Sequence, residues 1–267
     1  MSQLLAGKKG IIFGVLDEKS IAYAVAQKCK DHGAQFTLTN TPAAIRFGAV
    51  SDIAKELETI VIPADATSLD DVNTLFEQSI DHLGGKIDFV LHSVGMSINV
   101  RKGRAYTDLN HEWSKKSIDI SALSFHKVMQ VAYKNDYINE WGSVIGLTYM
   151  ASQRTFPDYN EMAESKSILE SIARSFGYHY GAHKKVRVNT VSQSPTMTTA
   201  GSGVKGFDSF FDFADKMSPL GNADAASCAD YCITLFSDLT RMVTMQNLYH
   251  DGGFSICLLY TSPSPRD

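Results

Sequence analysis

The fold of this chain is decided by the stretch GIIFGVLDEKSIA, residues 10–22. A short apolar run ends at Gly14, and a polar loop then leads to Ser20 at the start of an amphipathic segment. This order predicts a strand, a loop and a helix N-terminus. Gly14 lets backbone approach a diphosphate, and the amides after Ser20 form an anion site. Only one glycine stands where the common dinucleotide fingerprint has three, so Ser20 is also explained as a plain N-cap.

The same alternation of short apolar runs and longer amphipathic stretches continues along the chain. Strands are expected at residues 10–13, 35–39, 59–62, 89–92, 143–148, 186–191 and 246–249. Helices are expected at residues 20–32, 68–82, 114–133, 159–180 and 223–236. Ser20 and Ser68 stand where N-caps belong, and Gly33 and Gly84 where C-caps belong. The pattern predicts an α/β fold, a Rossmann-type doubly wound parallel sheet of about seven strands with helices on both faces.

Composition favours one domain over residues 1–256. The 267 residues are 44% apolar and 20% charged, which suffices for a full core. A net charge of −4 gives no pull toward nucleic acid, and no run of eighteen apolar residues predicts membrane insertion. The N-terminus lacks a signal peptide's apolar core, so we expect a cytoplasmic protein with its four cysteines reduced. His179 and His183 lack a nearby third ligand, so no metal site is predicted.

The last eleven residues, 257–267, differ in character from the rest of the chain. They can be back-translated into the transposon-end adapter used in building sequencing libraries, and their composition turns abruptly to Ser and Pro. We therefore expect the native protein to diverge after Ile256 and interpret residues 257–267 as a non-native, adapter-derived tail. A genuine flexible tail is the alternative. Sequencing the locus from intact genomic DNA separates the two.

The candidate chemistry lies in Tyr159 and Lys166, with Tyr149 upstream. If residues 159–166 are helical, seven steps of about 100° place the phenol and the ammonium on one helix face, about 10 Å apart along the axis. A nearby cation favours the phenolate and makes the tyrosine a better proton donor. Alone, this spacing also fits a tyrosine half in the core and a solvated lysine.

Together, several motifs resemble the enoyl-[acyl-carrier-protein] reductases of bacterial fatty-acid synthesis, a divergent branch of the short-chain dehydrogenase/reductase family. They are Gly14 with a five-residue gap to Ser20-Ile21-Ala22, His92-Ser93-Val94-Gly95, Tyr149, Tyr159-x6-Lys166 and Asp251-Gly252-Gly253-Phe254. The wider family usually has a serine thirteen residues before the tyrosine. Here that position is Gly146, and Tyr149 is present instead, which is the enoyl-reductase arrangement. The resemblance runs from about Leu5 to Ile256.

The resemblance implies catalytic roles for Tyr149, Tyr159 and Lys166. Tyr159 would donate a hydrogen bond to the thioester carbonyl of a trans-2-enoyl substrate while hydride reaches C3 from nicotinamide. Such a donor acts as an oxyanion hole. Lys166 would hold the nicotinamide ribose, and Tyr149 would line the substrate pocket and assist proton delivery. A packing role for Tyr149 is the alternative.

The resemblance also implies a set of binding residues. Cofactor-binding residues would be Gly14, Ser20, Ile21, Asp65, Ala66, Ser93, Gly95, Lys166, Thr196 and Thr198. Substrate-binding residues would be Met96, Ser97, Tyr149, Tyr159, Met197 and Phe207. Residues 196–220 resemble the family's mobile substrate-binding loop and helices, with Phe207 on an apolar face suited to an acyl chain. Asp65 is equally explained as a turn residue before Ser68.

The end of the second predicted strand, Thr39-Asn40-Thr41-Pro42, bears on the cofactor. No Arg or Lys follows directly to bind a 2'-phosphate, so NADH is favoured, and NADPH stays possible because Arg46 could reach in. The implied partners are an acyl carrier protein and further copies of the chain in a homotetramer built partly on the Tyr159 helix. Lys205 is followed by acidic residues, so the carrier would either dock more weakly or dock on Arg101, Lys102 and Arg104. Gln193-Ser194 stands where relatives usually have Ala-Gly.

Two other functions compete with enoyl reduction. A related reductase acting on a 3-oxoacyl or other carbonyl would share the fold and the cofactor site, but Gly146 and Tyr149 argue against it. A non-catalytic nucleotide-binding scaffold on the same fold would have no need of Tyr149, Tyr159 and Lys166 together.

Overall fold

A parallel sheet forms the centre of the molecule in a computed structural model, which describes residues 3–199, 201 and 206–257. Within these residues the sheet has six strands in the order β2-β1-β3-β4-β5-β6. The strands are β1 (Lys9–Phe13), β2 (Gln35–Thr39), β3 (Ile87–His92), β4 (Ile138–Thr148), β5 (Arg187–Gln193) and β6 (Asn247–His250). The doubly wound α/β prediction is confirmed.

The helices run between these strands. They are α1 (Ile21–Asp31), α2 (Pro42–Phe47), α3 (Val50–Glu56), α4 (Leu69–Leu83), α5 (Ile98–Arg101), α6 (His111–Ile118), α7 (Ser124–Lys134), α8 (Met162–Lys184), α9 (Phe207–Met217) and α10 (Ala225–Phe236). A π-helix, η2 (Asp119–Leu123), joins α6 to α7. Short 3-10 helices are η1 (Tyr106–Asp108), η3 (Met150–Ser152), η4 (Pro157–Tyr159), η6 (Asp238–Thr240) and η7 (Phe254–Ile256). The helix expected at residues 114–133 is thus one helical run with a π turn inside it.

The third of the seven predicted strands, residues 59–62, is wrong. This segment makes a single bridge, Leu38 to Val61, in which the Leu38 amide donates to Ile60 O and the Ile62 amide donates to Leu38 O. Beyond Pro63 the Ala64 amide donates to Asn40 O, so the segment stays beside β2 there without adding a second bridge. The sheet therefore ends at β2 on this side.

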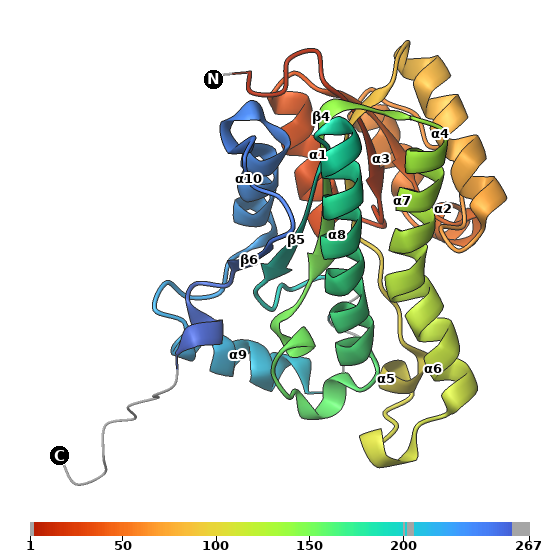
Figure 1. Cartoon of the computed structure of the whole chain (residues 1–267). Helices are drawn as coiled ribbons and strands as arrows, with labels where there is room; N and C mark the ends of the chain where they lie inside the picture. Colours follow the sequence, from red (N-terminus) through yellow and green to blue (C-terminus); the bar gives the residue numbers. More distant parts are fainter. Residues whose placement is uncertain (1–2, 200, 202–205, 258–267) are drawn as a thin grey trace, which may run out of the picture.

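Helices cover both faces of the sheet (Figure 1). On one face α4, α7 and α8 bury an apolar cluster that includes Leu75, Phe125 and Leu169. On the other face α1, α3 and α10 bury a second cluster that includes Val25, Ile53 and Phe236. The central strands β1 and β3 are therefore packed against apolar side chains on both sides, which explains their near-continuous apolar runs in the sequence.

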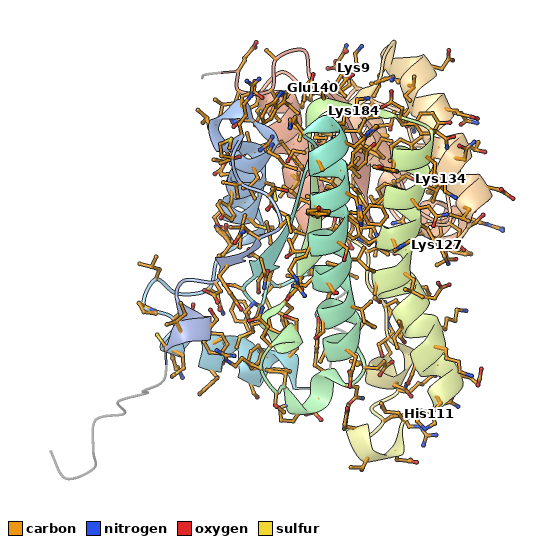
Figure 2. All side chains as sticks on the ribbon, in the orientation of Figure 1. Lys9, His111, Lys127, Lys134, Glu140 and Lys184 are labelled. Atoms are coloured by element: carbon orange, nitrogen blue, oxygen red, sulfur yellow. The ribbon has the colours of Figure 1, made fainter. Side chains whose placement is uncertain are left out.

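The strands all end at the same edge of the sheet. In Figure 2, Lys9 at the start of β1 and Lys184 at the end of α8 lie at one end of the molecule, and His111 at the start of α6 lies at the other. The chain crosses from β1 to β2 on one side, and β3 pairs with β1 on the other. Ligands of such sheets bind where this order reverses, beyond the carboxyl ends of the strands.

Residue 200 and residues 202–205 of the expected substrate-binding loop lie outside the described residues, as do residues 258–267 of the expected adapter-derived tail. The non-native origin of the tail stays a prediction. Among the described residues, none of the helices has the length and apolar character needed to cross a membrane.

Candidate active site

A cavity of about 1030 Å³ opens at the carboxyl ends of the strands. Its wall is built from the loops after β1, β3 and β5, the segment between β4 and α8, and helix α9. Figure 1 shows α9 below the ends of β4 and β5, beside the start of α8. The cavity therefore lies at the predicted edge of the sheet, and its volume suits a dinucleotide together with a second molecule.

Tyr159 and Lys166 both line this cavity, but the reasoning that placed them together is wrong in part. Tyr159 ends the 3-10 helix η4, and α8 begins only at Met162. Between them Asn160 has φ 47° and ψ −141°, a conformation outside any helix that asparagine tolerates better than most residues. The Asn160 side chain donates to Arg104 O at 2.9 Å, which fixes the break. The two residues therefore reach the same cavity from η4 and from α8, and not from one helix face.

The electrostatics of the pair also differ from expectation. Burial raises the pKa of the Tyr159 phenol to about 12, with no lowering by a cation. Burial lowers the pKa of the Lys166 ammonium to about 8, while the charge of Glu170 opposes that change. The ammonium donates to Leu147 O at 2.9 Å. Tyr159 is thus held as a neutral phenol, a hydrogen-bond donor rather than a proton source.

Tyr149 joins an aromatic cluster on the cavity wall. Its ring centroid lies 5.2 Å from that of Tyr159 and 6.4 Å from that of Phe210 on α9. Phe156 packs between them, 6.1 Å from Tyr159 and 4.0 Å from Phe210. The Tyr149 hydroxyl is buried without a hydrogen-bond partner among the described residues, and its pKa is raised by burial. An unpaired hydroxyl in an apolar wall is costly unless a ligand meets it.

The nucleotide end of the cavity is formed at the β1 loop. Gly14 has φ 94°, and a Cβ there would lie 1.9 Å from Ser93 O, so only glycine fits. Ser20 stands at the N-cap of α1, but its hydroxyl donates to Asp17 O and makes no cap bond, contrary to the predicted role. Among the described residues the amides of Ile21 and Ala22 have no acceptor. They point to an anion at this helix start, so the residues fit a dinucleotide.

Most of the expected binding residues line the cavity. From the cofactor set these are Gly14, Ser20, Ile21, Ser93, Gly95, Lys166, Thr196 and Thr198, and from the substrate set Met96, Ser97, Tyr149, Tyr159 and Phe207.

Three expected residues, Asp65, Ala66 and Met197, are not part of the lining. The Asp65 carboxylate accepts from the Thr67 amide and hydroxyl, so it serves the turn before α4, and Met197 is 53% exposed. Arg46 also stays outside the lining, with its guanidinium 5.4 Å from the ring centroid of Phe47.

Other lining residues were missed by the sequence. Asn40 lines the nucleotide end and donates to Val15 O, and Phe254 contacts Phe210. Gln193 is 4% exposed, donates to Thr196 Oγ1 at 3.1 Å and shares a hydrogen bond of 2.7 Å with His250 Nδ1. The departure Gln193-Ser194 was the available signal. The role of Gln193 could not be predicted from this departure alone, because its partners Thr196 and His250 lie on separate segments.

The Gly14 conformation makes a direct prediction. Replacing Gly14 with Ala should lower the free energy of unfolding by about 3 kcal/mol, because the methyl group meets Ser93 O and the backbone is left-handed. Chemical denaturation of the two proteins measures this. Gly103→Ala is the matched control, since Gly103 also has positive φ but no atom lies within 4 Å of the place its Cβ would take, so only the smaller backbone cost of about 1 kcal/mol applies. Equal losses in both variants would contradict the close approach of Ser93.

Known proteins match this geometry over most of the chain. A family profile described as Enoyl-(Acyl carrier protein) reductase matches residues 14–255. The enoyl-[acyl-carrier-protein] reductase [NADH] 2 of Rhizobium meliloti (strain 1021) is 32% identical over 271 residues, covering 100% of this chain and 98% of the relative.

Solved structures agree in fold as well as in sequence. The FabI-NADH complex from Alistipes finegoldii has a TM-score of 0.95 and 60% identity, covering 96% of this chain and 91% of that one. The Bacillus cereus enoyl-acyl carrier protein reductase with NADP+ and indole naphthyridinone has a TM-score of 0.89 and 29% identity, covering 97% of this chain and 100% of that one. Because the family profile spans strands β2 to β6 and every residue that lines the cavity, the chain belongs to the enoyl-(acyl carrier protein) reductase family.

Proposed function

We propose that this chain reduces the double bond of a trans-2-enoyl thioester, carried by an acyl carrier protein, with NADH as hydride donor in fatty-acid elongation. The observation that carries the proposal is the Tyr159 hydroxyl. Tyr159 lines the cavity with its ring 5.2 Å from that of Tyr149, and its hydroxyl has no hydrogen-bond partner among the described residues. A neutral donor without a protein partner, in a cavity that the Lys166 ammonium also lines, suits a carbonyl oxygen that gains negative charge.

The chain's own residues would act on that oxygen. Tyr159 would donate a hydrogen bond to it, and a pKa of about 12 keeps the phenol protonated at neutral pH. Lys166 would bind ribose hydroxyls and add positive potential, held in place by Leu147 O. The bound nicotinamide supplies the hydride. Tyr149, Phe156 and Phe210 would exclude water from the reacting carbon, because their rings close one side of the cavity.

The nucleotide end supports NADH over NADPH. Asn40 and Thr41 line the cavity there, and Arg46 stacks on Phe47 instead of facing the cavity. A 2'-phosphate would therefore lack a cation in this conformation. The Bacillus cereus relative with NADP+ shows that the fold also accepts the phosphorylated nucleotide in that protein. Steady-state kinetics with both nucleotides tests the choice: a large preference for NADPH would make Arg46 the phosphate ligand.

The substrate end is proposed from the same cavity. Met96, Ser97 and Phe207 would contact the acyl chain. Met197 is exposed, but its sequence neighbours Thr196 and Thr198 line the cavity, so Met197 would contact the acyl chain when the loop closes. A homotetramer built partly on α8 is the proposed assembly.

The carrier protein is proposed to dock at the basic residues after α5. Arg101 lines the cavity, whereas Arg104 is paired with Asp108 at 2.7 Å. Arg101 and Lys102 would therefore receive the carrier protein more readily than Arg104.

One observation bears on the competing 3-oxoacyl reductase. Gly146 lies in β4, where a Cβ would stand 3.0 Å from Leu169 Cδ2. A serine at this position, as in the wider family, would require a small shift of the Leu169 side chain, so the packing here suits glycine better than serine.

The proposal is tested by following loss of NADH absorbance with a crotonyl thioester and, separately, with an acetoacetyl thioester. We expect turnover of the crotonyl compound at least ~100-fold faster, because discrimination on the order of 3 kcal/mol follows when one substrate lacks its catalytic donors. Faster reduction of the acetoacetyl compound would establish the 3-oxoacyl alternative. Absence of turnover with both would favour the nucleotide-binding scaffold.

A further inference from the structure

A buried carboxylate lies one helical turn beyond Lys166. Glu170 on α8 is 3% exposed and accepts three hydrogen bonds. Its Oε1 accepts from Thr148 Oγ1 at 2.8 Å and from Ser152 Oγ at 2.5 Å, and its Oε2 accepts from Gln153 Nε2 at 3.2 Å. Both oxygens are therefore satisfied by neutral donors, and among the described residues Glu170 has no ion pair within 4.0 Å.

The three donors share one property, which is their position around Tyr149. Thr148 precedes Tyr149 at the end of β4, and Ser152 and Gln153 follow it in and after η3. Gln153 also accepts from the Tyr249 hydroxyl at 2.8 Å, which extends the network to β6. A buried carboxylate without a cation is costly, and a glutamine or an apolar side chain could fill the same volume. The charge therefore calls for a role beyond packing.

We infer that Glu170 is a positioning residue, whose carboxylate holds the segment on both sides of Tyr149 against the helix that carries Lys166. The side chain ties the two ends of the Tyr149 segment to one point on α8. The ammonium of Lys166 is tied to the same strand by Leu147 O, two residues before Tyr149. Movement of the segment would thus shift Tyr149 and the lysine anchor together. This role rests on the proposed function, because it concerns residues assigned to enoyl reduction.

The charge of Glu170 has a second effect, on Lys166 itself. Glu170 stands four residues from Lys166 on α8, where side chains of a helix are neighbours, and it opposes the lowering of the Lys166 pKa by burial. The surrounding charged and titratable groups are His92 of β3, Tyr149, Arg154, Tyr249 and Asp251. Burial and the Lys166 charge lower the His92 pKa to about 3, so this histidine stays neutral and adds no charge near the ammonium.

The test compares Glu170→Gln with Ser152→Ala. Glutamine keeps the volume but removes the charge and presents a second amide donor to Gln153, whereas Ser152→Ala removes one hydrogen bond and keeps the charge. For Glu170→Gln we expect kcat with a crotonyl thioester to fall about 10-fold. We also expect the alkaline limb of the pH profile of kcat to move about one pH unit lower, because the Lys166 pKa loses the raising effect of the Glu170 charge. For Ser152→Ala we expect a smaller loss of kcat, about 3-fold, and no movement of the limb.

Unfolding of the protein without nucleotide gives a readout independent of turnover. The folded pKa of Lys166, about 8, is below its unfolded value of 10.5, so the unfolded state binds more protons between these values and stability rises with pH there. Subtracting the curve of a Lys166→Met variant isolates this rise from other groups. In Glu170→Gln the rise should begin about one pH unit lower than in the parent protein, and in Ser152→Ala it should begin at the same pH.

The outcomes separate this inference from the proposed function. A parent protein without enoyl reduction removes the proposed function, while the unfolding curves still test the Glu170 to Lys166 coupling. Parent-like kcat and pH profiles in Glu170→Gln would overturn the positioning role, as would equal pH movements in both variants. If Glu170→Gln does not fold, the double variant Thr148→Val with Ser152→Ala replaces it, because it removes two of the three donors to Glu170. In this variant kcat should fall about 10-fold while NADH affinity stays unchanged. An unchanged kcat would overturn the inference.

Discussion

Replacing Tyr159 with Phe is expected to lower kcat for an enoyl thioester by about 100-fold, while the Kd of NADH stays within about 2-fold. The change deletes one hydroxyl and keeps the ring contacts with Tyr149 and Phe156. Because that hydroxyl has no partner among the described residues, its loss leaves no protein group unpaired. The loss should therefore fall on the transition state alone. Single-turnover kinetics together with NADH fluorescence titration measures both quantities.

The matched control is Tyr178→Phe, the same chemical change on an exposed ring of α8 that is 63% accessible. It should leave kcat unchanged. An unchanged kcat in Tyr159→Phe would remove the mechanism proposed for this site, because another donor would then have to stabilise the oxygen. A fall in kcat that came with an equal weakening of NADH binding would assign Tyr159 to the nucleotide instead.

The sequence predicted the sheet well because its strands are buried on both faces. The runs at β1 and β3 are largely apolar and bounded by glycine or polar loops, so periodicity and length agree. The run at residues 59–62 is also short and largely apolar, yet it forms only one bridge to β2 among the described residues, Leu38 to Val61. Propensity could not distinguish an added strand from a segment that only touches β2.

The sequence predicted which residues meet at the site better than how they meet. Tyr159, Lys166 and Tyr149 share the cavity, but α8 begins three residues after Tyr159 because Asn160 leaves the helical conformation. The expected lowering of the Tyr159 pKa was wrong, because burial raises that pKa and no cation lowers it. Burial depends on tertiary packing, and so do the partners of Glu170 on the β4 segment, which no local spacing indicates.

Lys166→Met should weaken NADH binding and strengthen the fold at the same time. The lysine is 7% exposed, and its pKa, lowered from 10.5 to about 8, means that burying the charge costs about 3 kcal/mol at neutral pH. Methionine keeps most of the side-chain stem but leaves Leu147 O without its hydrogen-bond donor. The lost hydrogen bond costs about 1 kcal/mol and offsets part of the gain. The free energy of unfolding without nucleotide should therefore rise by about 2 kcal/mol, measured by denaturation at pH 7.

The same substitution removes the donor proposed for two ribose hydroxyls, so the Kd of NADH should rise about 100-fold, since each charge-assisted hydrogen bond contributes about 1.5 kcal/mol. Lys116→Met, a change of an exposed lysine on α6, should alter neither quantity. A fold that becomes weaker in Lys166→Met would show that Lys166 is a structural cation. A more stable protein with unchanged NADH affinity would show that Lys166 does not bind the nucleotide. Only higher stability together with weaker NADH binding fits a buried ammonium that destabilises the free protein and serves to bind NADH.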